Sequence, residues 1–180
     1  MRGVKILVLS VALAVLPLLV VSARGGGGIT WGQEYFNPSL SNFDLQTTYS
    51  GAYGYGVMHD GQRIGGFALG LRSSAPSSDF GAGFVGVITG QEVHLGRVMG
   101  AVNLWTGLGG MRASPVLSTP DCFALFGQVE LELGFGFTRV MQLTAYAGMQ
   151  AIAAVVDGRP LFSEVMYTPV LGLRLAWGSF

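Results

Sequence analysis

Lysine is nearly absent from this sequence, and charge of either sign is scarce. The only lysine among the 180 residues is Lys5, and charged residues make up 11% of the chain, against about 25% in a typical soluble domain. A water-facing surface is normally coated with long charged side chains, and this chain has too few of them to coat one. The formal net charge is zero and no basic run is present, so nucleic acid is a poor candidate partner.

Cysteine pairs and helical periodicity are missing as well. Cys122 is the only cysteine, so no disulfide can form within the chain. His59 and His94 lie on different segments with no cysteine cluster nearby, so we expect neither a metal site nor a cofactor. Beyond residue 23 no stretch has a convincing helical period. Glycine and aromatic residues are plentiful instead, with 29 Gly, 11 Phe, 6 Tyr and 3 Trp, a mixture typical of strands and turns.

The first 23 residues have the pattern of a signal peptide. A basic start, MRGVK, precedes an apolar run of 16 residues, and VSA supplies the small-residue spacing that a signal peptidase accepts. The run is shorter than the ~20 residues of a spanning helix, so we expect cleavage after Ala23, and an uncleaved membrane anchor is the alternative. Residues 24–28 are then expected to form a flexible glycine-rich lead, and residues 29–180 a single barrel domain.

Eight segments are expected to be strands. They cover about residues 29–36, 43–57, 63–73, 80–95, 98–111, 123–136, 141–155 and 164–178. Most reach the roughly 9 to 11 residues that cross a bilayer at a tilt. The tight turns HDGQ, GR and FTRV alternate with the longer links NPSLSN, APSSD, RASPVLSTPDC and DGRPLFS. This alternation predicts an all-β, up-and-down antiparallel eight-stranded barrel of the transmembrane type.

The stretch GQVELELGF shows why the two faces of these strands matter. Glu130 and Glu132 alternate with Val129, Leu131 and Leu133, the pattern of a strand with one polar and one apolar face. If water surrounds the protein, the leucines form the core. If lipid surrounds it, the glutamates do.

Two arguments favour placing the polar faces inside. The apolar faces carry no charge over their middles, and the polar faces are rich in small residues that suit the narrow lumen of an eight-stranded barrel. In the segment 43–57 this assignment turns Tyr49, Tyr53 and Tyr55 outward and Thr48 and Ser50 inward.

This inside-out interpretation makes three sets of residue predictions. A polar network in the lumen is predicted from Asp44, Arg72, Glu92, His94, Glu130, Glu132 and Arg174. The predicted lipid-facing residues include Leu131, Leu133, Leu171, Leu173 and Leu175. Aromatic residues near strand ends, where a girdle would meet the membrane interface, are Trp31, Tyr55, Phe135, Tyr167 and Trp177.

The architecture resembles a known family. A signal peptide, eight alternating strands and a last strand YTPVLGLRLAWGSF that ends in Phe180 are similar to the small bacterial outer-membrane barrels typified by the OmpA transmembrane domain, OmpX and OmpW. The resemblance implies an outer-membrane location, a lipid environment, a monomer, and insertion through recognition of the C-terminal strand. It implies a structural or adhesive role and a lumen too full to serve as a large pore.

Two other functions stay open at this stage. A soluble periplasmic barrel of lipocalin type would turn its apolar faces inward around a hydrophobic ligand. An outer-membrane lipid-modifying enzyme could be assembled from Ser50, His94 and Glu92, although polar lumen groups explain these residues more simply and we expect no enzyme. The segment GAGFVG has dinucleotide-motif spacing, but it lies inside an alternating strand and opens no helix.

Overall fold

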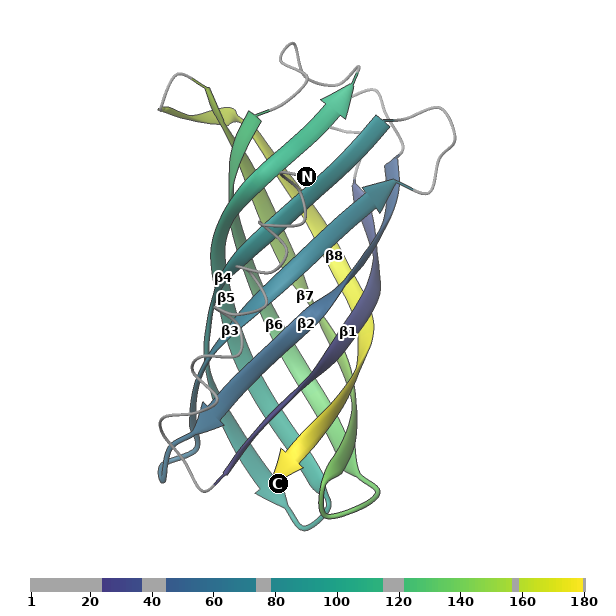
Figure 1. The fold of residues 1–180 in the computed structure, drawn as a ribbon, viewed down its shortest axis with the longest axis vertical. Helices are drawn as coiled ribbons and strands as arrows, with labels where there is room; N and C mark the ends of the chain where they lie inside the picture. The colour runs from purple at the N-terminus through teal and green to yellow at the C-terminus, as the bar shows by residue number, and fades with distance from the viewer. Residues whose placement is uncertain (1–23, 37–44, 74–78, 115–121, 157–158, 180) are drawn as a thin grey trace, which may run out of the picture.

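In the computed structural model, eight antiparallel strands close into one barrel in sequence order, with β1 paired to β8 (Figure 1). The structure describes residues 24–36, 45–73, 79–114, 122–156 and 159–179. The strands are β1 (Gly25–Phe36), β2 (Leu45–Val57), β3 (Gln62–Ser73), β4 (Asp79–Leu95), β5 (Val98–Ser114), β6 (Cys122–Gly136), β7 (Met141–Val156) and β8 (Arg159–Ser179). The predicted fold class is confirmed. The predicted signal peptide and Asp44 lie outside the described residues.

The two ends of the barrel differ in their connections. Residues 58–61, 96–97 and 137–140 join β2 to β3, β4 to β5 and β6 to β7 as tight turns at one end, here called the turn end. At the opposite end, here called the loop end, β1, β3, β5 and β7 end and β2, β4, β6 and β8 begin (Figure 1). Gly61 and Gly96 lie in these tight turns with φ of 84° and 65°, a left-handed conformation that glycine adopts without steric penalty.

Two boundaries differ from the sequence-based expectation. Residues 25–28, expected as a flexible lead, are the first residues of β1, paired with β2 and β8. A Cβ on Gly28 would collide with the carbonyl oxygen of Leu175, so glycine permits the close approach of the two strands. The expected link DGRPLFS belongs mostly to β8, which begins at Arg159 and pairs with β7 beyond a β-bulge at Ala153 and Val155.

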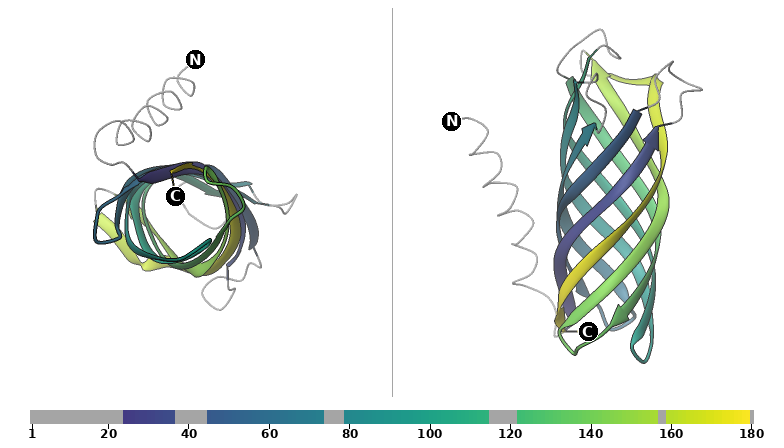
Figure 2. Two further views of the ribbon diagram at one scale, coloured as in Figure 1. Left: turned by 90° about the horizontal axis from the view of Figure 1, so that it is seen from below. Right: turned by 90° about the vertical axis from the view of Figure 1, so that its right-hand side faces the viewer.

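The barrel lumen is packed with side chains and forms the core. Viewed along its axis, the wall closes completely around the lumen (Figure 2). An aromatic cluster joins four strands: the ring centroid of Phe67 lies 4.9 Å from that of Trp105 and 5.4 Å from that of Phe126, and Phe126 lies 5.0 Å from Phe84. Bulky rings of this kind fill the interior of a small barrel.

The predicted faces of β2 are reversed. Tyr49, Tyr53 and Tyr55 are buried in the lumen, whereas Thr48 and Ser50 are exposed on the outer face. Tyrosine suits this lumen because its ring fills volume and its hydroxyl finds polar partners. The Tyr55 hydroxyl, for example, accepts a hydrogen bond from Arg63 Nη2 at 3.4 Å.

Candidate functional site

A chain of ion pairs crosses the lumen and is the main concentration of buried charge in the described structure. Arg63 on β3 contacts Glu92 on β4, with 2.6 Å between Nε and Oε2, and also pairs with Glu132 on β6. Arg174 on β8 pairs with the other oxygen of Glu132 and with Glu130, at 2.5 Å between Nη1 and Oε1. Glu132 therefore bridges both arginines. All five side chains are nearly inaccessible to solvent, so each charge depends on its neighbours for compensation.

Neutral side chains complete the hydrogen bonding around Glu130. Trp105 Nε1 donates to Oε1 at 2.7 Å and Asn103 Nδ2 to the same oxygen at 3.1 Å, while Gln128 Nε2 donates to Oε2 at 2.6 Å. Together with the two contacts from Arg174, these bonds satisfy both carboxylate oxygens. A buried carboxylate that is this well satisfied stabilises one arrangement of the strands around it.

Aromatic rings cover the two arginines. The guanidinium carbon of Arg174 lies 3.9 Å from the ring centroid of Tyr146 and 4.4 Å from that of Trp105. The guanidinium carbon of Arg63 lies 4.4 Å from the ring centroid of Tyr55. These cation–π contacts exclude water from the ion pairs and hold the charged groups in place.

The network ends at the turn end of the lumen. His94 Nε2 lies 2.8 Å from Glu92 Oε1, and the His94 side chain is about one quarter exposed, at 23%. The three glutamates and two arginines that form these ion pairs carry together a formal charge of 2 − 3 = −1.

The structure places the predicted lumen residues unevenly. Glu92, Glu130, Glu132 and Arg174 are buried together, with His94 at the mouth. Arg72 is instead exposed on the outer face of β3 near the loop end, because the odd-numbered residues of this strand, Phe67 and Leu71 included, face the lumen. The prediction that Arg72 joins the lumen network is wrong.

One of the five predicted interface aromatics is placed differently from the prediction. Tyr55 was predicted as an interface aromatic, but it is buried beneath Arg63. Trp31, Phe135, Tyr167 and Trp177 do lie exposed on the outer face, each more than 40% accessible.

Sequence reasoning missed three buried polar residues. Arg63 lies on the same face of β3 as apolar residues, so the pattern of this strand did not indicate a lumen position for it. Trp105 was not recognised as a hydrogen-bond donor to the network. Glu34 on β1 is also buried and accepts a hydrogen bond from Thr47 Oγ1 on β2 at 3.0 Å. A single glutamate inside a long, otherwise uncharged strand is the signal that could have marked Glu34, whereas β3 carries two arginines and its sequence does not show which of them is buried.

The enzyme constellation is not assembled. Ser50 is exposed on the outer face of β2, whereas Glu92 faces the lumen and His94 its turn-end mouth. The three side chains therefore do not share one site. Among the residues whose positions are described, no group of three or more His, Cys, Asp or Glu could hold a metal ion.

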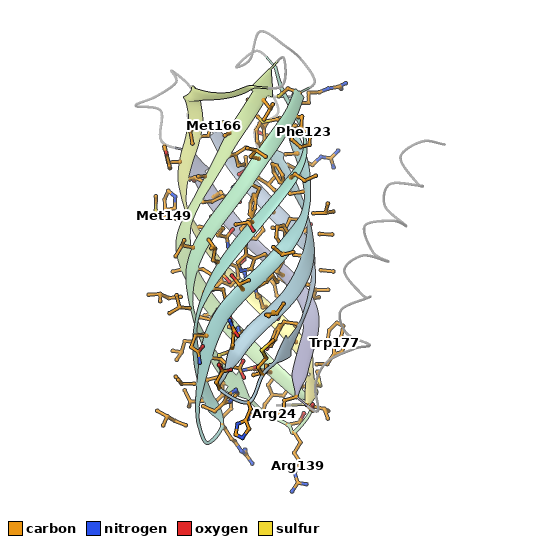
Figure 3. All side chains as sticks on the ribbon, turned by 90° about the vertical axis from the view of Figure 1, so that its left-hand side faces the viewer. Arg24, Phe123, Arg139, Met149, Met166 and Trp177 are labelled. Carbon is orange, nitrogen blue, oxygen red and sulfur yellow. The ribbon has the colours of Figure 1, made fainter. Side chains whose placement is uncertain are left out.

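The outer face of the barrel is a broad apolar surface. Its exposed aliphatic side chains include Val87, Val93, Val102, Leu104, Leu108, Leu125, Val129, Leu131, Leu133, Leu143, Met149, Leu171 and Leu173. Met149 and Trp177 project away from the wall in Figure 3. Where outward-facing strand side chains are described, charge appears only on Arg72 and Arg112 near the loop end. Leu131 and Leu171 are 64% and 65% exposed and Leu175 is half-buried, so the predicted lipid-facing leucines lie on this surface.

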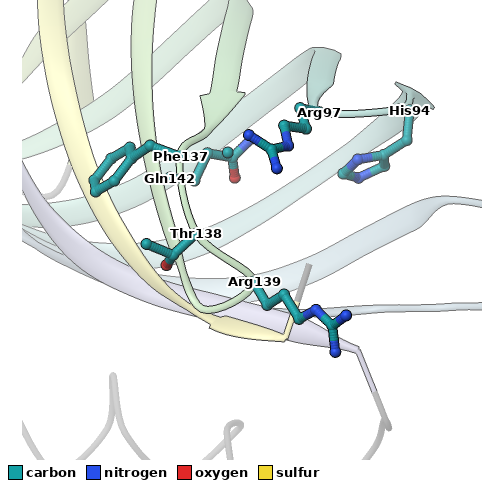
Figure 4. A pocket seen from close by; sticks show the side chains of 8 residues that line it. His94, Arg97, Phe137, Thr138, Arg139 and Gln142 are labelled. Atoms are coloured by element: carbon teal, nitrogen blue, oxygen red, sulfur yellow. The ribbon is translucent and has the colours of Figure 1, made fainter.

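A cavity opens at the turn end, between the β4–β5 and β6–β7 turns (Figure 4). It has a volume of about 350 Å³ and is lined in part by His94, Arg97, Thr138, Arg139 and Gln142.

The described part of the chain contains no helix long and apolar enough to cross a membrane.

Comparison with known proteins places the chain by its fold. No family model and no curated protein sequence matches it. Among solved structures, the crystal structure of Neisserial surface protein A (NspA) is similar, with a TM-score of 0.58 and 13% sequence identity over 87% of this chain and 95% of that chain. At this identity the likeness concerns the fold, a small closed antiparallel barrel.

Proposed function

We propose that this protein is an integral barrel of the bacterial outer membrane, related in kind to the OmpA transmembrane domain, OmpX and OmpW. The observation that supports the proposal is the distribution of polarity: buried ion pairs fill the lumen while exposed leucines and valines cover the outside. A protein surrounded by water has the opposite arrangement. Lipid is a favourable environment for the apolar outer face. Closure of the sheet gives the backbone groups of every strand edge their hydrogen-bond partners.

The proposed role is structural or adhesive rather than transporting or catalytic. Arg174, Trp105 and the rings around them occupy the middle of the lumen, so little space is left for a permanent conduit. In this proposal the protein acts through its anchoring in the membrane and through its loop end, which faces the outside of the cell. The similar fold of NspA, a protein named for the surface of its organism, supports this assignment. We propose a monomer that inserts through recognition of its C-terminal strand.

Heat-modifiable gel mobility, combined with cell fractionation, tests the proposal. The unheated protein refolded in detergent should migrate faster than the boiled protein, because a closed barrel resists detergent unfolding. The native protein should be recovered with the outer membrane after an alkaline wash. Recovery in the soluble periplasmic fraction would contradict the membrane assignment and favour a lipocalin-like barrel.

A further inference from the structure

The turn-end cavity has a cationic lining. Its positive charges are Arg97, from the β4–β5 turn, and Arg139, from the β6–β7 turn, and His94 at the end of β4 adds a ring nitrogen. Among the residues that the structure describes, no carboxylate lines the cavity and neither Arg97 nor Arg139 forms an ion pair. In the lumen, by contrast, Arg63 and Arg174 are both compensated by glutamates.

The two turns that carry these cations are joined to one another. The Gly136 amide donates a hydrogen bond to the Arg97 carbonyl oxygen at 2.8 Å, which links the end of β6 to the β4–β5 turn. His94 is in turn held by Glu92. The backbone positions of the cationic residues are therefore set by the barrel before any ligand arrives, and such preorganisation favours binding.

Arg97, Thr138 and Gln142 supply hydrogen-bond donors to the cavity. Arg97 reaches toward Gln142 across the cavity, whereas Arg139 extends away from its turn toward the outer edge (Figure 4). The Thr138 hydroxyl and the Gln142 amide add neutral polar groups to the lining. A guanidinium forms two parallel hydrogen bonds with a tetrahedral oxyanion, which makes phosphate a better match than a halide.

Apolar residues surround this cationic cavity. Leu95, Phe137 and Val140 are exposed beside it, Leu95 to 81%. Such residues next to arginines are typical of a surface at the boundary between lipid tails and headgroups.

We propose that the cavity binds a phosphate group, with Arg97 as its main contact and Arg139 as a second contact at its edge. The source of the phosphate is either a phospholipid headgroup or a free phosphate ester. The site lies at the end opposite to the loops, and it does not depend on the proposed surface role. The cavity of about 350 Å³ is large enough to admit a headgroup as well as its phosphate.

A titration monitored by NMR tests this site in the folded protein. The protein is held in a maltoside detergent, which carries no phosphate, and its folding is verified by heat-modifiable mobility. Short-chain phosphatidylglycerol and glycerol phosphate are added separately, with sodium chloride at equal ionic strength as a control. Saturable shifts of the Gly96 and Gly136 amides are expected with a phosphate probe and not with chloride. Tighter binding of phosphatidylglycerol identifies the lipid headgroup as the source, and equal binding identifies the free ester.

Arginine variants locate the contact. Arg97→Gln should weaken binding by about tenfold or more, as expected for loss of a charge-assisted contact, and Arg139→Gln should weaken it less. Arg72→Gln is the matched control, since Arg72 is an exposed arginine near the other end of the barrel, and it should leave binding unchanged.

Three results would overturn the site: no saturable shift with either phosphate probe, an equal response to chloride, or an equal loss in Arg72→Gln. Because folding is scored independently on the gel, absence of binding would leave the proposed membrane function standing. A failure of membrane insertion in cells would likewise leave the binding result standing.

Discussion

Arg174 and Glu130 meet through two parallel contacts in the lumen, with 2.5 Å between Nη1 and Oε1 and 2.7 Å between Nη2 and Oε2. Both side chains are almost fully buried. They belong to β8 and β6, which are separated in the wall by β7, so the pair links strands that share no backbone hydrogen bonds. This contact therefore stabilises the closed barrel beyond what strand pairing supplies.

Removing one partner of this pair should be strongly destabilising. Glu130→Ala leaves Arg174 with only Glu132 as a charged partner and also deprives Trp105 of its acceptor. We expect a loss of about 3 kcal/mol in the free energy of unfolding, measured as the denaturant midpoint in lipid vesicles. Thr106→Ala, on the exposed face of β5, is the control and should change the midpoint little. A silent Glu130→Ala would contradict the importance of the pair.

Substitutions at Leu131 test whether lipid lies outside. Leu131 neighbours Glu130 in sequence but is exposed on the outer face. Leu131→Arg near the bilayer middle should cost roughly 2 to 4 kcal/mol and impair insertion, whereas Leu131→Ala should cost little because no packed core is opened. Both are measured by refolding into vesicles. If Leu131→Ala were strongly destabilised while Glu130→Ala left the denaturant midpoint unchanged, the membrane assignment would be wrong.

The aromatic cluster provides a separate test of the lumen. Phe67 is 1% exposed and packs against Trp105 and Phe126, so Phe67→Ala should destabilise the barrel by about 3 to 5 kcal/mol. Ile64 on the same strand is 44% exposed on the outside, and Ile64→Ala should have a much smaller effect. Denaturant midpoints of the two variants give the comparison, and equal losses would mean that β3 has no distinct inner face.

The filled lumen predicts electrical behaviour as well. Arg63, Arg174, Trp105 and the tyrosines beside them occupy the interior of the barrel. We expect no large, steady conductance from the monomer in planar-bilayer recordings, because an eight-stranded barrel is only wide enough to be filled by side chains. Stable large channels would show that the packed interior rearranges in the membrane.

The sequence by itself determined the strands and their antiparallel order. Period-two alternation and the tight turns between β2 and β3, β4 and β5, and β6 and β7 predicted eight antiparallel strands with boundaries close to those observed. The alternation of β6 also placed Glu130 and Leu131 on opposite faces, as the structure has them. These features are local, because side-chain direction along a strand depends only on residue parity.

Only the tertiary structure decided which face of β2 points inward and which charges meet. The tyrosine side chain of Tyr53 suits either lipid or the polar lumen, so the alternation along β2 is compatible with both orientations. The space left in the lumen by the neighbouring strands decides between them. Arg63 and Arg72 lie on the same strand nine positions apart, and one is buried while the other is exposed. The pairing of Arg63 with Glu92 and Glu132, and of Arg174 with Glu130, depends on strand register and on distances across the lumen, which arise only when the barrel closes.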